Sequence, residues 1–151
     1  ARYFVPNIVE VTARGANTFC DYIKDEDDFD SVNVVMRGSN DELITIINSR
    51  HAAYGYDQRL ETFGSKGMLV ASNLAKTTVR SYTADHTEQR EPYMEFFLER
   101  YAISYRSELA RFVESISSGK QLNPSYDDGR QALFLAEAAL ESAKTGKTIK
   151  L

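Results

Sequence analysis

The residues with the clearest chemical potential lie in and just before the stretch AAYGYDQRLETFGSKGM, which begins at residue 52. Tyr54 and Tyr56 flank Gly55, and Asn48 and Arg50 precede them. These side chains offer both hydrogen-bond donors and acceptors, as the hydroxyls of a polyol require. A glycine inside an extended stretch indicates a bend or a close approach of other atoms. Two interpretations stay open: Tyr56 is a half-buried strand tyrosine, or it lines a polyol site.

No complete catalytic set accompanies these residues. The glycines form neither the dinucleotide-binding Gly-x-Gly-x-x-Gly turn nor a P-loop. His51 and His86 have no second metal ligand at helical spacing, and no serine lies in a nucleophile elbow. The adjacent pair Asp85-His86 is typical of a polar loop rather than of a catalytic dyad. We therefore expect neither a metal site nor a catalytic group within this chain.

Composition predicts one folded domain over residues 1–151. The chain is 42% hydrophobic and 26% charged, has no run long enough to span a membrane, and opens with no secretion signal. A single cysteine, Cys20, cannot form an internal disulfide, which favours the reducing cytoplasm. The acidic block DYIKDEDDFD at 21–30 accounts for the whole net charge of −4, because the rest of the chain is near neutral, and we interpret this block as a solvated loop. The sequence has no clustered basic residues that would form a nucleic-acid-binding face, so we expect no nucleic-acid partner.

The first half of the chain has the pattern of short strands. Val9, Val11 and Ala13 alternate with polar positions, and valine-rich and turn-bounded runs follow. We expect an antiparallel meander of five or six strands, with a turn at Gly64-Ser65-Lys66-Gly67. The predicted strands are Ile8–Arg14, Ser31–Arg37, Glu42–His51, Tyr56–Phe63, Met68–Ala71 and Thr77–Tyr82.

The second half changes to helical spacing. Tyr101, Tyr105 and Leu109 belong to one stripe of a helix predicted from about Tyr93 to Ser118, which Gly119 would end. A second helix is capped by Ser125 or Asp127 and ends near Gly146. Strands followed by helices predict an α+β fold, an open and mainly antiparallel sheet with helices on one face. The other face could meet water or another subunit.

Three stretches together are similar to a known family: NSRHAAYGYDQRLETFGSKGML, FFLERYAISYRSELARFVESI and DDGRQALFLAEAALESAKTGKTIKL. They resemble the inositol 2-dehydrogenases of the Gfo/Idh/MocA group of NAD(P)-dependent oxidoreductases. The resemblance implies that this chain is the C-terminal substrate-binding and oligomerisation domain. An N-terminal Rossmann domain, with NAD (alternatively NADP) and the catalytic lysine, would lie outside it. Residues 1–4 would end a helix whose catalytic Asp and His lie upstream.

The implied activity is hydride transfer from an inositol ring carbon to NAD, giving 2-keto-inositol, in inositol catabolism. By this resemblance Tyr56 faces the substrate most directly, and Tyr54, Arg50, Asn48 and Tyr105 are further substrate-binding candidates. The family pairs open sheet faces into dimers and tetramers, so a homo-oligomer is expected. The fragment alone is expected to be inactive. Two alternatives are a sibling sugar or polyol dehydrogenase and a non-catalytic α+β binding or dimerisation module.

Overall fold

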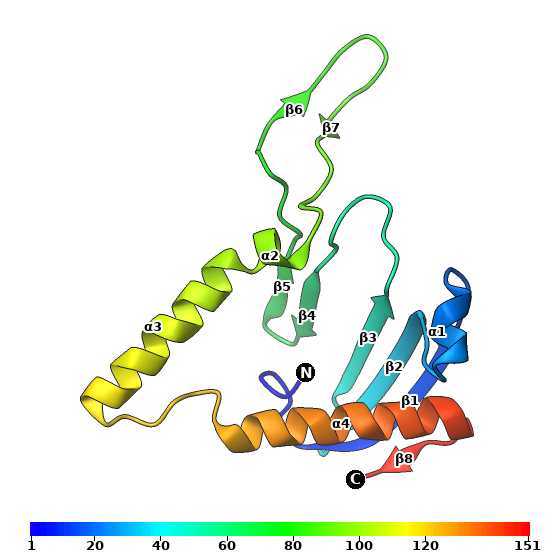
Figure 1. The fold of residues 1–151 in the computed structure, drawn as a ribbon, viewed down its shortest axis with the longest axis vertical. Helices are drawn as coiled ribbons and strands as arrows, with labels where there is room; N and C mark the ends of the chain where they lie inside the picture. The colour runs from blue at the N-terminus through cyan, green and yellow to red at the C-terminus, as the bar shows by residue number, and fades with distance from the viewer. The chain divides into compact units, whose positions relative to one another are not determined.

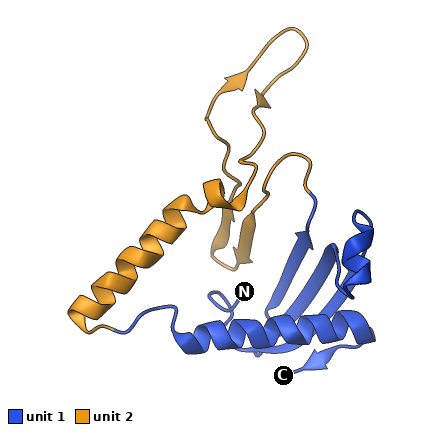
Figure 2. Cartoon of the chain, viewed as in Figure 1, with its two compact units in different colours: residues 1–51, 121–151 blue, residues 52–120 orange.

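The computed structural model describes residues 1–151. The chain divides into two compact units, which Figure 2 shows in different colours. Unit 1 comprises Ala1–His51 and Gln121–Leu151, and unit 2 comprises Ala52–Lys120.

Unit 1 is built on a four-stranded sheet in the order β3-β2-β1-β8. Each neighbouring pair is antiparallel, so the predicted hairpin of the second and third strands is confirmed. The short strand β8 was not predicted, because two residues after a helix carry too little pattern to indicate a strand. The four strands are β1 (Ile8–Ala16), β2 (Ser31–Gly38), β3 (Leu43–Ser49) and β8 (Ile149–Lys150).

Helix α4 (Tyr126–Thr145) lies across one face of this sheet, as Figure 1 shows. Its predicted start is confirmed in detail. The Ser125 hydroxyl accepts the Asp128 backbone N–H, and the Asp128 carboxylate accepts the Ser125 N–H in return. This reciprocal capping box satisfies two backbone donors that the first turn leaves free. Gly146 ends the helix in the left-handed region at φ 72°.

The core of unit 1 lies between α4 and the sheet. Val11 and Ala13 from β1 and Val34 and Met36 from β2 meet Ala138 from α4. All five are buried, and Val11 and Ala13 lie on one face of β1, as the alternation predicted. The opposite face of the sheet has no helix on it, and it exposes Val35, Leu43 and Ile47 among other residues.

The prediction that residues 21–30 form a solvated loop is wrong in two respects. Residues Asp21–Asp25 form the short helix α1, which buries Ile23. Asp30 is only 1% exposed, because its carboxylate folds inward onto backbone N–H groups of residues 18–20. The high density of charge in this block predicted exposure of every carboxylate. A carboxylate that accepts hydrogen bonds from several backbone amides can nevertheless be buried, whereas one that depends on water for its hydrogen bonds cannot.

Unit 2 contains two hairpins and two helices rather than further strands of one meander. The 64–67 turn is confirmed, but the strand predicted from Tyr56 begins only at Leu60, and the strand predicted at 77–82 has just two residues. The helix predicted from Tyr93 starts at Phe97 and is interrupted at Tyr101, while its end at Gly119 is confirmed. The elements are β4 (Leu60–Gly64), β5 (Gly67–Ala71), β6 (Arg80–Ser81), β7 (Gln89–Arg90), α2 (Phe97–Arg100) and α3 (Ala102–Ser118).

The predicted fold class is confirmed as α+β with antiparallel pairing throughout. None of the helices has both the length and the apolar character needed to cross a bilayer.

Candidate functional site

The segment Tyr54–Tyr56 leaves a turn and bends at Gly55 in unit 2, and a neighbouring backbone fixes it there. The Tyr56 N–H donates to the Met94 carbonyl at 2.7 Å, and the Tyr93 N–H donates to the Tyr54 carbonyl at 3.1 Å. Gly55 lies between these bonds at φ 111°, and a Cβ atom there would lie 2.8 Å from the Tyr93 carbonyl oxygen. The close approach predicted from this glycine is therefore confirmed.

Tyr56 points its phenol at a second tyrosine. Its hydroxyl oxygen lies 3.5 Å from that of Tyr101, and the two rings meet edge to face with centroids 5.7 Å apart. The Tyr101 oxygen also accepts a 2.7 Å hydrogen bond from Nε2 of Gln58. Tyr105, one turn further along α3, places its ring 6.2 Å from that of Tyr101, again edge to face. Tyr56 and Tyr105 are thus brought together through Tyr101.

Within this tyrosine cluster (Tyr56, Gln58, Tyr101 and Tyr105), the surroundings of Tyr56 favour its neutral phenol. The hydrogen bond with Tyr101, followed by burial, raises the pKa of Tyr56 above its ordinary value. A neutral phenol donates one hydrogen bond and accepts two. It can therefore bind a hydroxyl group of a ligand, but it is not suited to act as a general base. Arg100 stacks against the cluster, with its guanidinium carbon 6.0 Å from the Tyr101 ring centroid. Its Nε atom is buried and lacks a hydrogen-bond partner.

Tyr54, the other tyrosine of the segment, belongs to a different group. Its hydroxyl donates to Oδ2 of Asp57 at 2.8 Å, and the Arg59 guanidinium binds the same oxygen at 2.8 Å. The hydrogen bond to Asp57 and its charge raise the pKa of Tyr54. These residues line a hollow of about 490 Å³ with Arg90 and Tyr93. Because the Tyr54 hydroxyl and the Arg59 guanidinium already bind Asp57, we interpret these three residues as stabilising the fold of unit 2 rather than binding a ligand.

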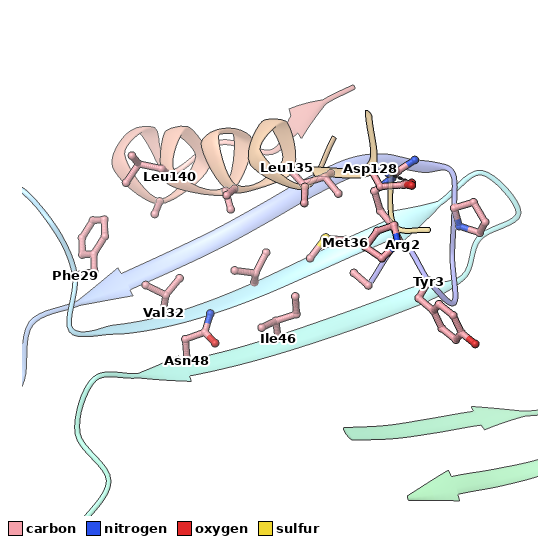
Figure 3. Close-up of a pocket in the computed structure, with 18 of the residues that line it drawn as sticks. Arg2, Tyr3, Phe29, Val32, Met36, Ile46, Asn48, Asp128, Leu135 and Leu140 are labelled. Atoms are coloured by element: carbon pink, nitrogen blue, oxygen red, sulfur yellow. Dashed lines mark hydrogen bonds and ion pairs between the residues drawn. The ribbon is translucent and has the colours of Figure 1, made fainter. Parts of the chain in front are cut away.

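Asn48 lies in unit 1, at a groove between the sheet and α4 that encloses about 720 Å³. Figure 3 shows Val32, Ile46 and Leu135 facing this groove, with Asn48 near one end. Arg2 and Asp128 form a 3.3 Å ion pair at the other end. The lining is mainly apolar, so the groove fits a packed segment or an apolar ligand better than a polyol.

Arg50 follows the end of β3, and its side chain is already engaged. Its Nη2 atom pairs with Oδ2 of Asp28 at 2.6 Å, and its Nε donates to the Phe29 carbonyl at 3.3 Å. The Arg50 backbone N–H also donates to the Asp30 carbonyl at 2.8 Å. Within unit 1, Arg50 therefore ties the end of β3 to the acidic block.

The chain does not fit a dinucleotide cofactor. All its strand pairs are antiparallel, whereas a pyrophosphate site of the Rossmann type needs a parallel βαβ unit opened by a glycine-rich turn. No group of three or more His, Cys, Asp and Glu side chains is arranged to hold a metal ion. What the tyrosine cluster offers is hydrogen bonding to a hydroxylated ligand.

Two residues of the site, Tyr101 and Asn73, were missed by sequence reasoning, and a third, Gln58, was placed in the wrong element. Tyr101 was assigned only to the apolar stripe of a helix, although its spacing of four from Tyr105 places both rings on one face. Gln58 was assigned to a strand that does not include it. Asn73, whose Nδ2 donates to the Tyr56 carbonyl at 3.0 Å, carries no local signal because the contact spans 17 residues.

Comparison with known proteins gives a consistent result over the whole chain. The family profile described as "Oxidoreductase family, C-terminal alpha/beta domain" (Gfo/Idh/MocA) matches residues 1–151. A myo-inositol 2-dehydrogenase from Thermotoga maritima is 41% identical over 152 residues, which cover 100% of this chain and 45% of that protein. This chain thus spans less than half the length of that relative.

Solved structures agree with the sequence comparison. A myo-inositol dehydrogenase from Corynebacterium glutamicum ATCC 13032 superposes with a TM-score of 0.94 at 57% identity, covering 99% of this chain and 45% of that one. A scyllo-inositol dehydrogenase from Lactobacillus casei, solved with NAD(H) and scyllo-inositol, superposes with a TM-score of 0.88 at 25% identity. That match covers 99% of this chain and 44% of the other.

Proposed function

This chain belongs to the Gfo/Idh/MocA oxidoreductase family, and from that premise we propose that it forms the substrate-side wall of an NAD-dependent inositol 2-dehydrogenase. The enzyme would oxidise a ring CH–OH of inositol to a ketone, as a step in inositol catabolism. Within this wall, the tyrosine cluster binds and orients the hydroxyls of the ring.

The observation that carries the proposal is the agreement of nearly the entire chain with inositol dehydrogenases, in sequence as well as in fold. The chemistry of the cluster supports it, because neutral phenols and an amide side chain match a ligand that offers donors and acceptors.

We propose that units 1 and 2 make up one C-terminal domain, and that NAD is bound elsewhere in a longer protein. The chain spans less than half of its relatives and has no fold element for a dinucleotide. Many large apolar side chains are exposed, and no residue of α3 is buried, as expected of a piece that packs against further structure. The reducing cytoplasm is the proposed compartment, since Cys20 is the one cysteine.

We also propose a homo-oligomer formed through the uncovered face of the main sheet. Leu43 and Ile47 are 76% and 75% exposed there, and neighbouring Val35 is 45% exposed. Sedimentation of the full-length enzyme tests this, with Ile47→Glu expected to dissociate it. The matched control is Tyr126→Glu on the exposed start of α4, which should leave the assembly intact. If the wild-type enzyme sediments as a monomer at high concentration, the proposed homo-oligomer is refuted.

The test of the activity is inositol-dependent NADH formation by the full-length parent, with myo-inositol, scyllo-inositol and simple sugars as substrates. NADH formation with an inositol is the expected result. If NADH forms only with a sugar, the enzyme is a sibling sugar or polyol dehydrogenase rather than an inositol dehydrogenase. If no polyol is oxidised and the open reading frame begins near Ala1, the chain is a non-catalytic module instead.

A further inference from the structure

The hydroxyl of Tyr101 lies between two partners inside unit 2. It accepts from Gln58 Nε2 at 2.7 Å and lies 3.5 Å from the hydroxyl of Tyr56. The first distance is that of a well-formed hydrogen bond, and the second is long for two hydroxyls. Hydrogen bonds in a site without its ligand are commonly long and tighten when the ligand binds. Gln58 thus anchors Tyr101, and Tyr101 is placed to act on Tyr56.

We infer that Tyr101, anchored by Gln58, is a positioning residue that directs the phenolic proton of Tyr56 toward a hydroxyl of the bound polyol, an inference that rests on the proposed function. Each phenol carries one proton and two acceptor sites. When the Gln58 amide donates to Tyr101, the Tyr101 proton is free to be donated to the Tyr56 oxygen. The Tyr56 proton then has no partner within the protein and remains available for the ligand.

The geometry restricts the alternatives for Tyr56. Its backbone is fixed by the bond to the Met94 carbonyl and by the bond that its own carbonyl accepts from Asn73. Its ring is held edge to face against Tyr101, which is itself held edge to face against Tyr105. With backbone and ring fixed, the remaining freedom is rotation of the hydroxyl hydrogen. That rotation is what a hydrogen bond from Tyr101 would control.

The experiment measures kcat, the KM for inositol and the KM for NAD in the full-length enzyme for Tyr56→Phe, Tyr101→Phe and the double variant. Tyr101→Phe alone should lower kcat/KM for inositol about three- to tenfold, the value of one net hydrogen bond. In the Tyr56→Phe background the same change should cost less than about twofold, because the hydroxyl that it positions is gone. The KM for NAD and the unfolding midpoint should not move. Tyr126→Phe, on an exposed ring without a hydrogen bond, is the matched control.

A second variant tests the direction of the hydrogen bonds. Gln58→Glu keeps the shape but accepts from Tyr101 instead of donating. A hydrogen bond between the two phenols can then form only with Tyr56 as its donor, and this bond competes with the ligand for the Tyr56 proton. This variant should lower kcat/KM about as much as Tyr101→Phe, whereas the exposed control Gln121→Glu should not.

The outcomes separate this inference from the function on which it rests. If Tyr56→Phe lowers turnover and the losses of the two tyrosine variants multiply, Tyr101 acts independently of Tyr56 and the positioning role is wrong. A fall in unfolding midpoint that parallels the kinetic loss would assign Tyr101 a structural role and also overturn it. If Tyr56→Phe has full activity, or if the parent enzyme oxidises no inositol, the proposed site fails and the inference fails with it.

Discussion

Asp30 and Phe19 are joined by a 2.7 Å hydrogen bond from the Phe19 backbone N–H to Oδ2 of the buried Asp30 carboxylate. The N–H groups of Thr18 and Cys20 donate to the same oxygen, at 2.9 and 3.1 Å. The Ser31 hydroxyl donates to the other oxygen at 2.8 Å. Backbone amides therefore stabilise this charge and fix the entry to α1. They do so at the point where the acidic block meets β2.

The first prediction concerns the pH dependence of this contact. Burial raises the pKa of the Asp30 carboxyl, but the hydrogen bonds from Phe19, Ser31, Cys20 and Thr18 outweigh it and hold the pKa below its ordinary value. A lowered pKa in the folded state means that the contribution to stability is complete above the unfolded-state pKa of about 3.9 and is lost as pH falls below it.

Asp30→Asn should therefore lower the unfolding midpoint at neutral pH, by about 5 °C on the usual scale for a chain of this size. The difference from wild type should stay constant down to about pH 5 and shrink below about pH 4. Thermal unfolding followed by circular dichroism across this range measures it. Asp21→Asn on the surface of α1 is the control, and an equal loss in both variants would contradict the assignment.

Ser142 gives the second prediction. This serine is fully buried on α4, where its hydroxyl accepts the Ala13 backbone N–H at 2.8 Å and donates to the Lys147 carbonyl at 2.5 Å. Strand β8 pairs only with Glu10 and Val11, so Ser142 takes the place of a strand partner further along β1. Ser142→Ala should cost about 1–3 kcal/mol by leaving backbone groups unpaired.

Chemical denaturation measures the loss at Ser142 against a matched control. Ser117→Ala removes an exposed hydroxyl that bonds only within α3, and it should change stability by less than about 0.5 kcal/mol. Equal effects in the two variants would show that the contact with β1 contributes nothing.

Two glycines give the third prediction, with opposite signs. Gly55→Ala forces a side chain into φ 111° and places a Cβ against the Tyr93 carbonyl, which should cost about 1–3 kcal/mol. Gly129→Ala, near the start of α4, meets nothing within 4 Å and should stabilise by about 0.5–1 kcal/mol. Urea unfolding of the pair tests the contrast, and a neutral Gly55→Ala would show that the 54–56 segment can shift.

The fourth prediction addresses the substrate. In the full-length enzyme, Tyr56→Phe should lower kcat/KM for inositol about tenfold through the loss of one hydrogen bond to the ligand, with little change in unfolding midpoint. Tyr54→Phe breaks the bond to Asp57 instead, and it should affect stability more than turnover. Steady-state kinetics together with thermal unfolding distinguish the two. Unchanged kinetics for Tyr56→Phe would return this residue to an ordinary packed tyrosine.

Local pattern was sufficient for the elements whose signals lie within a few residues. The Ser125 cap, the glycine ends of α3 and α4 and the hairpin of β2 with β3 were all predicted, because each depends on neighbouring residues in the chain. The close approach at Gly55 was predicted from the glycine itself, although the atoms that approach it belong to Tyr93 and Met94. Alternation alone placed Val11 and Ala13 on the same face of β1, and the structure shows both residues buried. The α+β class was decided at the same level, since strands precede helices.

Long-range contacts decided the rest. The burial of Asp30 depends on amides 10 to 12 residues away, that of Ser142 on β1, and the pairing of Tyr56 with Tyr101 on a separation of 45 residues. Sequence alone determined the family, the fold class and the candidate Tyr56. Only the tertiary structure showed that the two tyrosines have different partners: Tyr54 binds Asp57, and Tyr56 faces Tyr101. The physical reason is that a hydrogen-bond partner is selected by distance in space, and spacing along the chain does not encode that distance.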